Sequence, residues 1–443
     1  MKLEQNASFP SIEQWRDALQ TREPQQLRAA LFALAQVLPW SRDEDRAGLR
    51  SRALQHRAQR DPRLAAAWIE GLFRVGGDEV EGALRDHALG NDGSAESRAL
   101  AAARARELQA EVATRAALAA ARPAAADRDR LLELPLHAGF GDGIDDVAEL
   151  TLTPGDLERQ LRALCSPTQR ALLLAAGFAP ALATDCDGTT WKHDIGEALF
   201  ARAIELRRLL PAAGAKLRAT LERYRLTPSG EVNDDAAQLK RAFDSGALDA
   251  SGAAHGLSRR QVCAEYYAAN LWCFAGHTVA SMKAWGRELF EGSSGFEGKV
   301  FDGLSELLAS ARELGLIPYA ISASNQWIVE IGAEYLGIPP WRVAGVRARV
   351  EDGVITTEIE APLTYGAGKV DAIRALAGGA PAMAMGDSVD ATDRELLESA
   401  LLKIAVEPKP SRLGFVLARG RDNWRLLDFE RTEDGEAADT LTV

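Results

Sequence analysis

The order of apolar and polar residues divides this chain into a helical part and a part in which strands and helices alternate. Up to about residue 135 the sequence is rich in Ala, Leu, Arg and Glu and contains no strand-like run. Leu27, Leu31, Leu34 and Leu38 keep the spacing of one helix face. Further helices are predicted over 44–59, 62–74 and 94–121. This part is therefore expected to be an all-α domain.

From about residue 179 the pattern changes to apolar runs separated by helical segments. Strands are predicted over 179–184, 317–322, 383–386, 402–406 and 424–429, with helices over 303–314, 326–336 and 393–400. Such alternation is typical of βαβ units and a mostly parallel sheet covered on both faces. Asp352-Gly353 supplies turn residues for a hairpin within 349–359. The fold class is therefore expected to be α/β.

Four sections follow from these patterns. Residues 1–135 form a helical N-terminal domain, and 136–178 a connection with helices over 155–164 and 167–176. Residues 179–190 and 291–443 form the α/β core, which the mainly helical segment 191–290 interrupts. A length of 443 residues suits two or three domains. The N-terminal helices either pack on the core as an extension or bind a protein partner.

Composition narrows the class of protein. A net charge of −12 opposes a general nucleic-acid binder, because phosphate backbones require clustered positive charge. The chain contains no apolar run of about 18 residues, so no membrane segment is predicted. Its N-terminus lacks the apolar stretch of a signal peptide. The four cysteines have no CxxC spacing, and a cytoplasmic location is expected.

Polar side chains end three of the predicted strands. Asp185-Cys-Asp187-Gly-Thr189 follows the first strand, Ser322 ends the second, and Gly386-Asp387 ends the third. Lys369 precedes a helix after a glycine-rich stretch, but Val370 excludes the P-loop pattern. A carboxylate nucleophile, a hydroxyl, an ammonium and a further acid at strand ends can build a phosphoryl-transfer site.

In this order the motifs resemble the haloacid dehalogenase (HAD) superfamily, in its magnesium-dependent phosphatase branch, with the motif style of phosphoserine and phosphorylcholine phosphatases. The resemblance covers residues 179–443. It implies a Rossmann-like core with an inserted helical cap of the first type, C1, at 191–290. It further implies hydrolysis of a small phosphomonoester through an aspartyl-phosphate intermediate.

The resemblance also assigns roles to residues. Asp185 would be the nucleophile and Asp187 the general acid and base. Lys369 would offset negative charge and, with Thr189, Ser322 and Ala323, bind the phosphate. Ser322 is followed here by Ala-Ser, where the phosphoserine enzymes have Gly-Gly.

The implied cofactor is Mg²⁺, held by Asp185, Asp187 and Asp387. The usual second acid of the last motif would stand four residues after Asp387, where this chain has Ala391. Asp390 and Asp393 are both available for that role, and the sequence leaves the choice between them open.

For the substrate, Asp194 lies where the phosphoserine enzymes carry a carboxylate that binds the substrate amine. Asp194 with Glu197 equally forms a capping box for a helix. An aromatic stretch over 266–285 suits either a helical core or a site for a quaternary ammonium. An amine-bearing phosphomonoester, such as phosphoserine or phosphorylcholine, is the expectation. A phosphomutase and a partner-binding scaffold with a vestigial hydrolase domain are the alternatives.

Overall fold

The computed structural model describes residues 62–75, 78–90, 94–121, 151–291, 300–407, 410–417 and 423–427, with single residues between 24 and 54 and residue 429. The strands are β1 (Thr151–Leu152), β2 (Phe178–Thr184), β3 (Ile317–Asn325), β4 (Val343–Val346), β5 (Ala348–Glu351), β6 (Val354–Ile359), β7 (Ala380–Gly386), β8 (Leu402–Val406) and β9 (Trp424–Leu427). The helices before β3 are α4 (Pro62–Val75), α5 (Asp78–Leu89), α6 (Ala95–Ala120), α9 (Pro154–Leu164), α10 (Pro167–Ala175), α11 (Ile195–Glu205), η4 (Pro211–Ala213), α12 (Gly214–Arg223), α13 (Val232–Asp244), α14 (Ala247–Ala254), α15 (Arg259–Trp272), α16 (Val279–Phe290) and α17 (Leu304–Glu313). Those after β3 are α18 (Gln326–Tyr335), η5 (Pro340–Arg342), α19 (Ala367–Ala377), α20 (Arg394–Ser399) and α21 (Pro410–Leu417).

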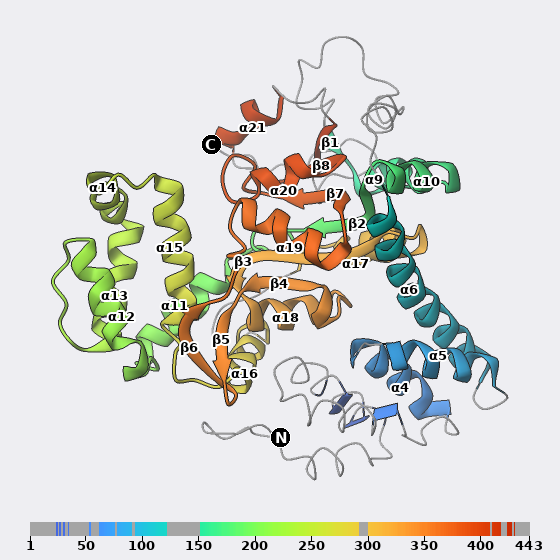
Figure 1. Cartoon of the computed structure of the whole chain (residues 1–443), viewed down its shortest axis with the longest axis horizontal. Coiled ribbons are helices and arrows are strands. Elements are labelled where there is room, and N and C mark those ends of the chain that lie inside the picture. Colours follow the sequence, from blue (N-terminus) through green and yellow to red (C-terminus); the bar gives the residue numbers. More distant parts are fainter. Residues whose placement is uncertain are drawn as a thin grey trace.

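A seven-stranded sheet forms the centre of the molecule (Figure 1). Its strand order is β1-β9-β8-β7-β2-β3-β4, and every neighbouring pair is parallel. The carboxyl ends of β2, β3 and β7 therefore meet at one edge of the sheet, where ligands of open α/β sheets usually bind. The predicted α/β fold, a parallel core with a helical insertion and preceding helices, is confirmed.

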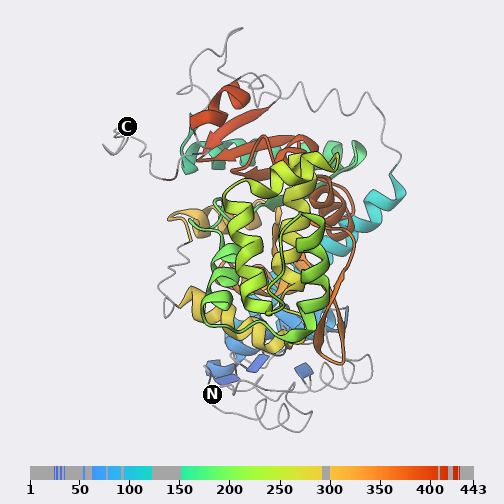
Figure 2. The same ribbon diagram turned by 90° about the vertical axis from the view of Figure 1, so that its left-hand side faces the viewer.

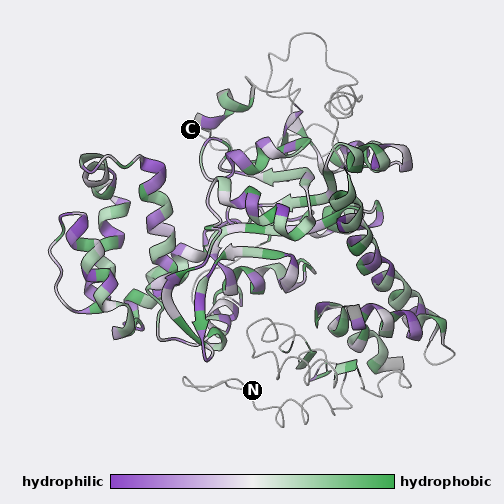
Figure 3. Ribbon diagram, viewed as in Figure 1, coloured by the Kyte–Doolittle hydropathy of each residue, from purple (hydrophilic) through white to green (hydrophobic). Residues whose placement is uncertain are grey.

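The sheet is buried on both faces because alternate residues of its strands enter two different apolar clusters. Leu182 belongs to one cluster, whereas Ala181 and Ala183 belong to the other. The alanine face packs against α19 and α20, since Ile373 and Leu396 lie in the same cluster. Near-continuous apolar strands are the usual pattern of such doubly covered sheets, and Figure 3 shows the central strands as mainly hydrophobic.

Between β2 and β3 the chain forms the helices α11 to α16. Helices α12 to α15 stand to one side of the sheet in Figure 1 and face the viewer in Figure 2. The hairpin β5–β6 joins these helices to the core. Backbone bonds connect Gly276 and His277 to Ile355, and the Lys216 Nζ donates to Thr357 O at 2.5 Å. The helical segment is thus fixed at its base by a part of the core.

A buried ionic cluster fixes α6 to the core. Arg342 is 1% exposed and its guanidinium donates to Glu111 Oε2 at 3.0 and 2.7 Å and to Glu107 Oε1 at 2.5 Å. The Tyr319 hydroxyl of β3 donates to Glu111 Oε1 at 3.1 Å. Around α4 and α5 a separate apolar cluster includes Trp68 and contacts Trp341 of the core. The helices before residue 121 are therefore packed on the core in the part of the chain that the structure describes.

Most of the predicted elements have ends within two residues of the observed ones. Two strands are longer than predicted: strand 317–322 continues to Asn325, and strand 383–386 begins three residues earlier, at Ala380. The hairpin turn is also confirmed, since Asp352 and Gly353 have φ of 50° and 78°. The prediction missed β1, β4, α5 and α21. Most of 44–59 and all of 123–150 lie outside the described residues. The domain limits stay a prediction.

Candidate active site

The loop after β2 presents two acids at the carboxyl edge of the sheet. Asp185 continues the strand ladder, because its N–H donates to Met385 O at 2.9 Å. Gly188 then turns the chain with φ of +76°, in the left-handed region that glycine tolerates. A Cβ at Gly188 would lie 3.0 Å from Asp387 Cγ. A glycine is therefore required both for the turn and for the close approach of β7.

Lys369 joins Asp185, which follows β2, to Asp393, the N-cap of α20. It lies in the first turn of α19 and is fully buried. Its Nζ is 2.5 Å from Asp185 Oδ1 and 2.6 Å from Asp393 Oδ1. The Thr189 hydroxyl donates to Asp185 Oδ2 at 3.3 Å. The structure thus brings Lys369 and Asp393 together with Asp185 and Thr189 of the loop after β2.

Burial and mutual repulsion dominate the electrostatics of this cluster. Burial raises the pKa of the Asp185 carboxyl well above its usual value, and the Asp393 charge adds to the rise while Lys369 opposes it. Burial and Asp393 also raise the pKa of Asp387 to about 7, against the lowering effect of Arg412. Burial alone would lower the pKa of Lys369, but Asp185 and Asp393 raise it. The two acids outweigh burial, so the pKa of Lys369 is raised overall.

The structure separates the two acids that the sequence left as alternatives. Asp393 is fully buried and its Oδ2 accepts the Ser388 N–H at 2.9 Å, in addition to its bond with Lys369. The Asp390 side chain is 47% exposed and is paired with Arg412 at 2.8 Å. Asp393 is thus part of the buried cluster, whereas Asp390 lies on its rim.

Three carboxylates are close enough to share a cation. Oxygen atoms of Asp185, Asp387 and Asp393 lie within 4.8 Å of one another. Hard oxygen donors are the ligands that Mg²⁺ prefers. Both oxygens of Asp185 and of Asp393 already accept hydrogen bonds. Among the described residues, Asp387 Oδ2 has only long contacts, with Ser388 at 3.5 Å and Arg412 at 3.7 Å. The donor set fits Mg²⁺, with Asp387 the carboxylate least engaged by the protein.

Four donors hold the second acid of the loop, Asp187. The Trp191 indole and the Ile195 N–H donate to Oδ1 at 2.8 and 2.9 Å. The hydroxyls of Ser322 and Ser324 donate to Oδ2 at 3.2 and 2.7 Å. Ser322 thus reaches the site, as the strand pattern predicts, but in this structure it contacts Asp187. Ala323 follows in the same strand.

Asp194 caps a helix, which is one of the two roles that the sequence left open for it. It is the N-cap of α11, with Oδ1 accepting the Glu197 N–H at 2.8 Å. The second half of the predicted capping box does not form, because the Glu197 carboxylate turns to other partners. It accepts from Asn270 at 2.5 Å, from the Tyr266 hydroxyl at 3.1 Å and from Lys240 at 3.1 Å.

The aromatic rings of 266–285 pack mostly with the protein's own groups. Tyr266 stacks on Phe243 with centroids 3.6 Å apart. Lys216 lies 5.1 Å from the Trp272 ring, and Arg208 lies 5.0 Å from the Trp285 ring. Two rings therefore already have a cation on them.

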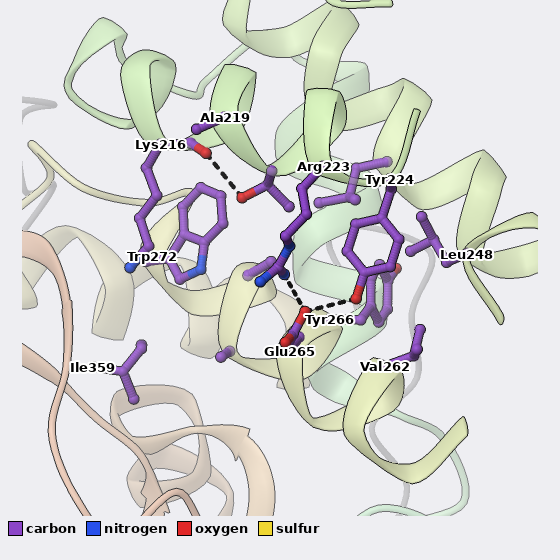
Figure 4. Close-up of a pocket in the computed structure, with 14 residues that line it drawn as sticks. Lys216, Ala219, Arg223, Tyr224, Leu248, Val262, Glu265, Tyr266, Trp272 and Ile359 are labelled. Atoms are coloured by element: carbon purple, nitrogen blue, oxygen red, sulfur yellow. Dashed lines mark hydrogen bonds and ion pairs between the residues drawn. The ribbon is translucent and has the colours of Figure 1, made fainter. Parts of the chain in front are cut away.

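A pocket of about 380 Å³ lies among α12, α13, α14 and α15, away from the aspartates (Figure 4). Its polar groups face one another. Glu265 accepts from the Tyr224 hydroxyl at 2.6 Å and pairs with Arg223. The candidate chemistry is thus at the sheet edge and not in this larger pocket.

Sequence reasoning missed Arg412, Asn270 and Asn325, and treated Glu197 only as a cap residue. Arg412 approaches the last motif from α21, where its Nη1 donates to Asp387 O at 3.3 Å and to Ser388 Oγ at 3.2 Å. Arg412 and Asn270 stand at no fixed spacing from a motif, whereas Asn325 directly follows the Ser-Ala-Ser sequence at 322–324. Only Ser324, within the Ser-Ala-Ser sequence, had a visible signal.

Two comparisons with known proteins find nothing, and a third finds distant structural likeness. No protein-family model and no curated protein matches the chain. A protein of unknown function from Bordetella pertussis is 20% identical, covering 56% of this chain and 98% of its own, with a TM-score of 0.39. A phosphoserine phosphohydrolase-like protein from Francisella tularensis is 18% identical, covering 56% and 94%, with a TM-score of 0.33. A HAD family hydrolase from Salmonella enterica is 17% identical, covering 62% and 82%, with a TM-score of 0.36. Scores below 0.5 at such identities do not establish a family.

Proposed function

We propose that this protein hydrolyses small phosphomonoesters through an aspartyl-phosphate intermediate. One observation carries the proposal: Lys369 Nζ lies 2.5 Å from Asp185 and 2.6 Å from Asp393 at the carboxyl edge of the sheet. A buried ammonium between two acids keeps a carboxylate in place and offsets the charge of an incoming phosphate. A carboxylate that continues β2 at the carboxyl edge of the sheet, beside the Thr189 hydroxyl and the Lys369 ammonium, suits a nucleophile.

The chemistry requires two steps with balanced bonds. A carboxylate oxygen of Asp185 attacks phosphorus, the bond from phosphorus to the ester oxygen breaks, and Asp187 gives a proton to the leaving alcohol. Water then attacks the aspartyl phosphate and passes a proton to Asp187, which releases inorganic phosphate and restores both acids. Thr189, Ser322 and the backbone at Ala323 would bind phosphate oxygens.

Mg²⁺ is the proposed cofactor, held by Asp185, Asp387 and the backbone carbonyl of Asp187. When bound it supplies positive charge to the phosphate oxygens. Asp393 would act from behind these ligands, since it holds Lys369 and the Ser388 N–H. Asp390 is the less suitable second acid because its contact is with Arg412.

An amine on the substrate is the finer expectation from the sequence, and it stays a prediction. Its support is the negative charge around Tyr267. Burial is the largest cause of the raised pKa of the Tyr267 hydroxyl, and Asp194, Glu197 and Asp187 raise that pKa further. Asp194 accepts the Glu197 N–H and so caps α11, which favours a structural role for this residue instead.

The test is release of inorganic phosphate from a panel of phosphomonoesters, measured with Mg²⁺ and after treatment with EDTA. We expect turnover with Mg²⁺, its loss in EDTA and its recovery on adding the metal back. Asp387→Asn should weaken the Mg²⁺-dependent rise in melting temperature, a readout that does not depend on turnover. A panel with no hydrolysed member would overturn the proposal.

A further inference from the structure

A small cavity, lined by both apolar and polar groups, lies between the helical insertion and the carboxyl end of β3. Its lining includes Gly196 of α11, Tyr267 and Asn270 of α15, and Ser324 and Asn325 of β3. The cavity measures about 10 Å³, which is room for one water molecule or one hydroxyl group. It borders the proposed reaction, because the Ser324 hydroxyl on its wall donates to Asp187 at 2.7 Å.

Two buried amide atoms on this wall have no hydrogen-bond partner among the described residues. They are Asn270 Oδ1 and Asn325 Nδ2, on side chains 7% and 6% exposed. Leaving such atoms unpaired is costly, because each has given up its hydrogen bonds to water. Two unpaired atoms on one small cavity therefore point to a ligand group that fills it.

The other contacts of the two amides decide which atom of each is free. Asn270 Nδ2 donates to the Glu197 carboxylate at 2.5 Å, so its oxygen is the free atom. Asn325 Oδ1 accepts the Trp327 N–H at 3.0 Å as the N-cap of α18, so its NH₂ is the free atom. Neither amide can turn over without losing its existing bond. The two amides that line the cavity thus leave one acceptor and one donor free.

We infer that this cavity selects a substrate whose leaving alcohol carries a second hydroxyl. A hydroxyl donates to Asn270 and accepts from Asn325 at the same time. An ammonium can only donate, and a carboxylate can only accept. The inference rests on the proposed phosphatase function and names its substrate class as phosphate esters of short diols and polyols.

Four esters that differ in one terminal group test the inference without any variant. They are 2-hydroxyethyl, 2-aminoethyl, carboxymethyl and n-propyl phosphate. We expect kcat/KM for 2-hydroxyethyl phosphate to exceed that of each other ester by about tenfold or more, since a buried polar site rejects analogues that leave it unpaired.

Two substitutions of one residue then assign the effect to the cavity. Asn325→Ser keeps a capping oxygen for α18 but removes the NH₂ donor, so the preference for hydroxyethyl over propyl phosphate should fall by about tenfold. Asn325→Asp keeps the cap and turns the free donor into an acceptor, so the ratio of aminoethyl to hydroxyethyl turnover should rise by about tenfold.

Asn423→Asp is the matched control, because Asn423 is also a buried amide with unpaired atoms. It precedes β9 at the amino-terminal edge of the sheet, opposite the cavity. We expect this variant to keep the wild-type ratios.

The outcomes separate the inference from the function on which it rests. Equal turnover of all four esters, abolished by Asp185→Asn, would keep the phosphatase and show that the cavity holds a water molecule only. A wild-type preference for the aminoethyl ester would replace the diol with an amine. Failure to hydrolyse any of these esters or p-nitrophenyl phosphate would overturn the proposed function and the inference with it.

Discussion

Asp185 is the residue on which the proposed chemistry depends most. Asp185→Asn should reduce turnover by several powers of ten, because an amide cannot attack phosphorus and losing one such group typically has that effect. The fold should survive, since Lys369 keeps its bond to Asp393 at 2.6 Å. Phosphate release measures the loss of turnover, and circular dichroism checks that the fold is intact. Activity above a tenth of wild type would contradict the role of Asp185 as nucleophile.

At the residue scale, the sequence predicted the groups that stand at strand ends and missed those that fold in from elsewhere. Asp185, Ser322 and Asp387 follow apolar runs, so their meeting at one sheet edge could be expected. Arg412 and Asn270 reach the site from helices whose positions depend on tertiary packing, and no local spacing marks them. The choice of Asp393 over Asp390 likewise needed the position of Lys369.

At the element scale, α11 begins beside the site and its cap can be tested. Asp194→Ala should lower the free energy of unfolding by about 0.5–2 kcal/mol, because the Glu197 N–H loses its acceptor. We expect equal effects on KM for 2-aminoethyl and n-propyl phosphate. Asp194→Ser, which keeps a capping oxygen without the charge, should restore stability. A KM increase confined to the aminoethyl ester in both variants would instead assign amine recognition to Asp194.

The contact of α16 with α18 includes a buried ion pair whose contribution to stability can be tested. Lys283 and Glu330 form a buried pair at 2.5 Å with side chains 7% and 1% exposed. Lys283→Met should destabilise the fold by about 3–5 kcal/mol, because the Glu330 charge stays buried without its ammonium partner. Urea unfolding measures this loss.

Adding Glu330→Leu to Lys283→Met should recover most of the stability, since an apolar pair of similar size replaces the ions. Gln326 loses one bond in the double variant but keeps its contact with Val343 O at 3.2 Å. A single variant as stable as wild type would mean that solvent reaches Glu330.

At the scale of the whole molecule, the α/β core could be predicted because its strands are long apolar runs bounded by polar residues. Strand β4 was not predicted because Val343–Val346 is short and contains a glycine. The attachment of α6 could not be predicted, because Glu111 stands four residues before Arg115, a spacing typical of an ion pair on a solvated helix face. In the structure Glu111 is 5% exposed and also binds Arg342.

Two truncations test whether α6 belongs to the core. Removing residues 1–120 leaves Arg342, which is 1% exposed, without Glu107 and Glu111, and should destabilise the core by about 3–5 kcal/mol. Removing residues 1–93 keeps α6 and should leave phosphate release measurable, because every proposed site residue follows residue 180. Melting temperature and phosphate release compare the two chains. Arg342→Met in the shorter chain removes the unpaired charge and should recover part of the lost stability. If the chain without α6 melts like the full protein, the ionic cluster contributes nothing to the core and α6 is only an attachment.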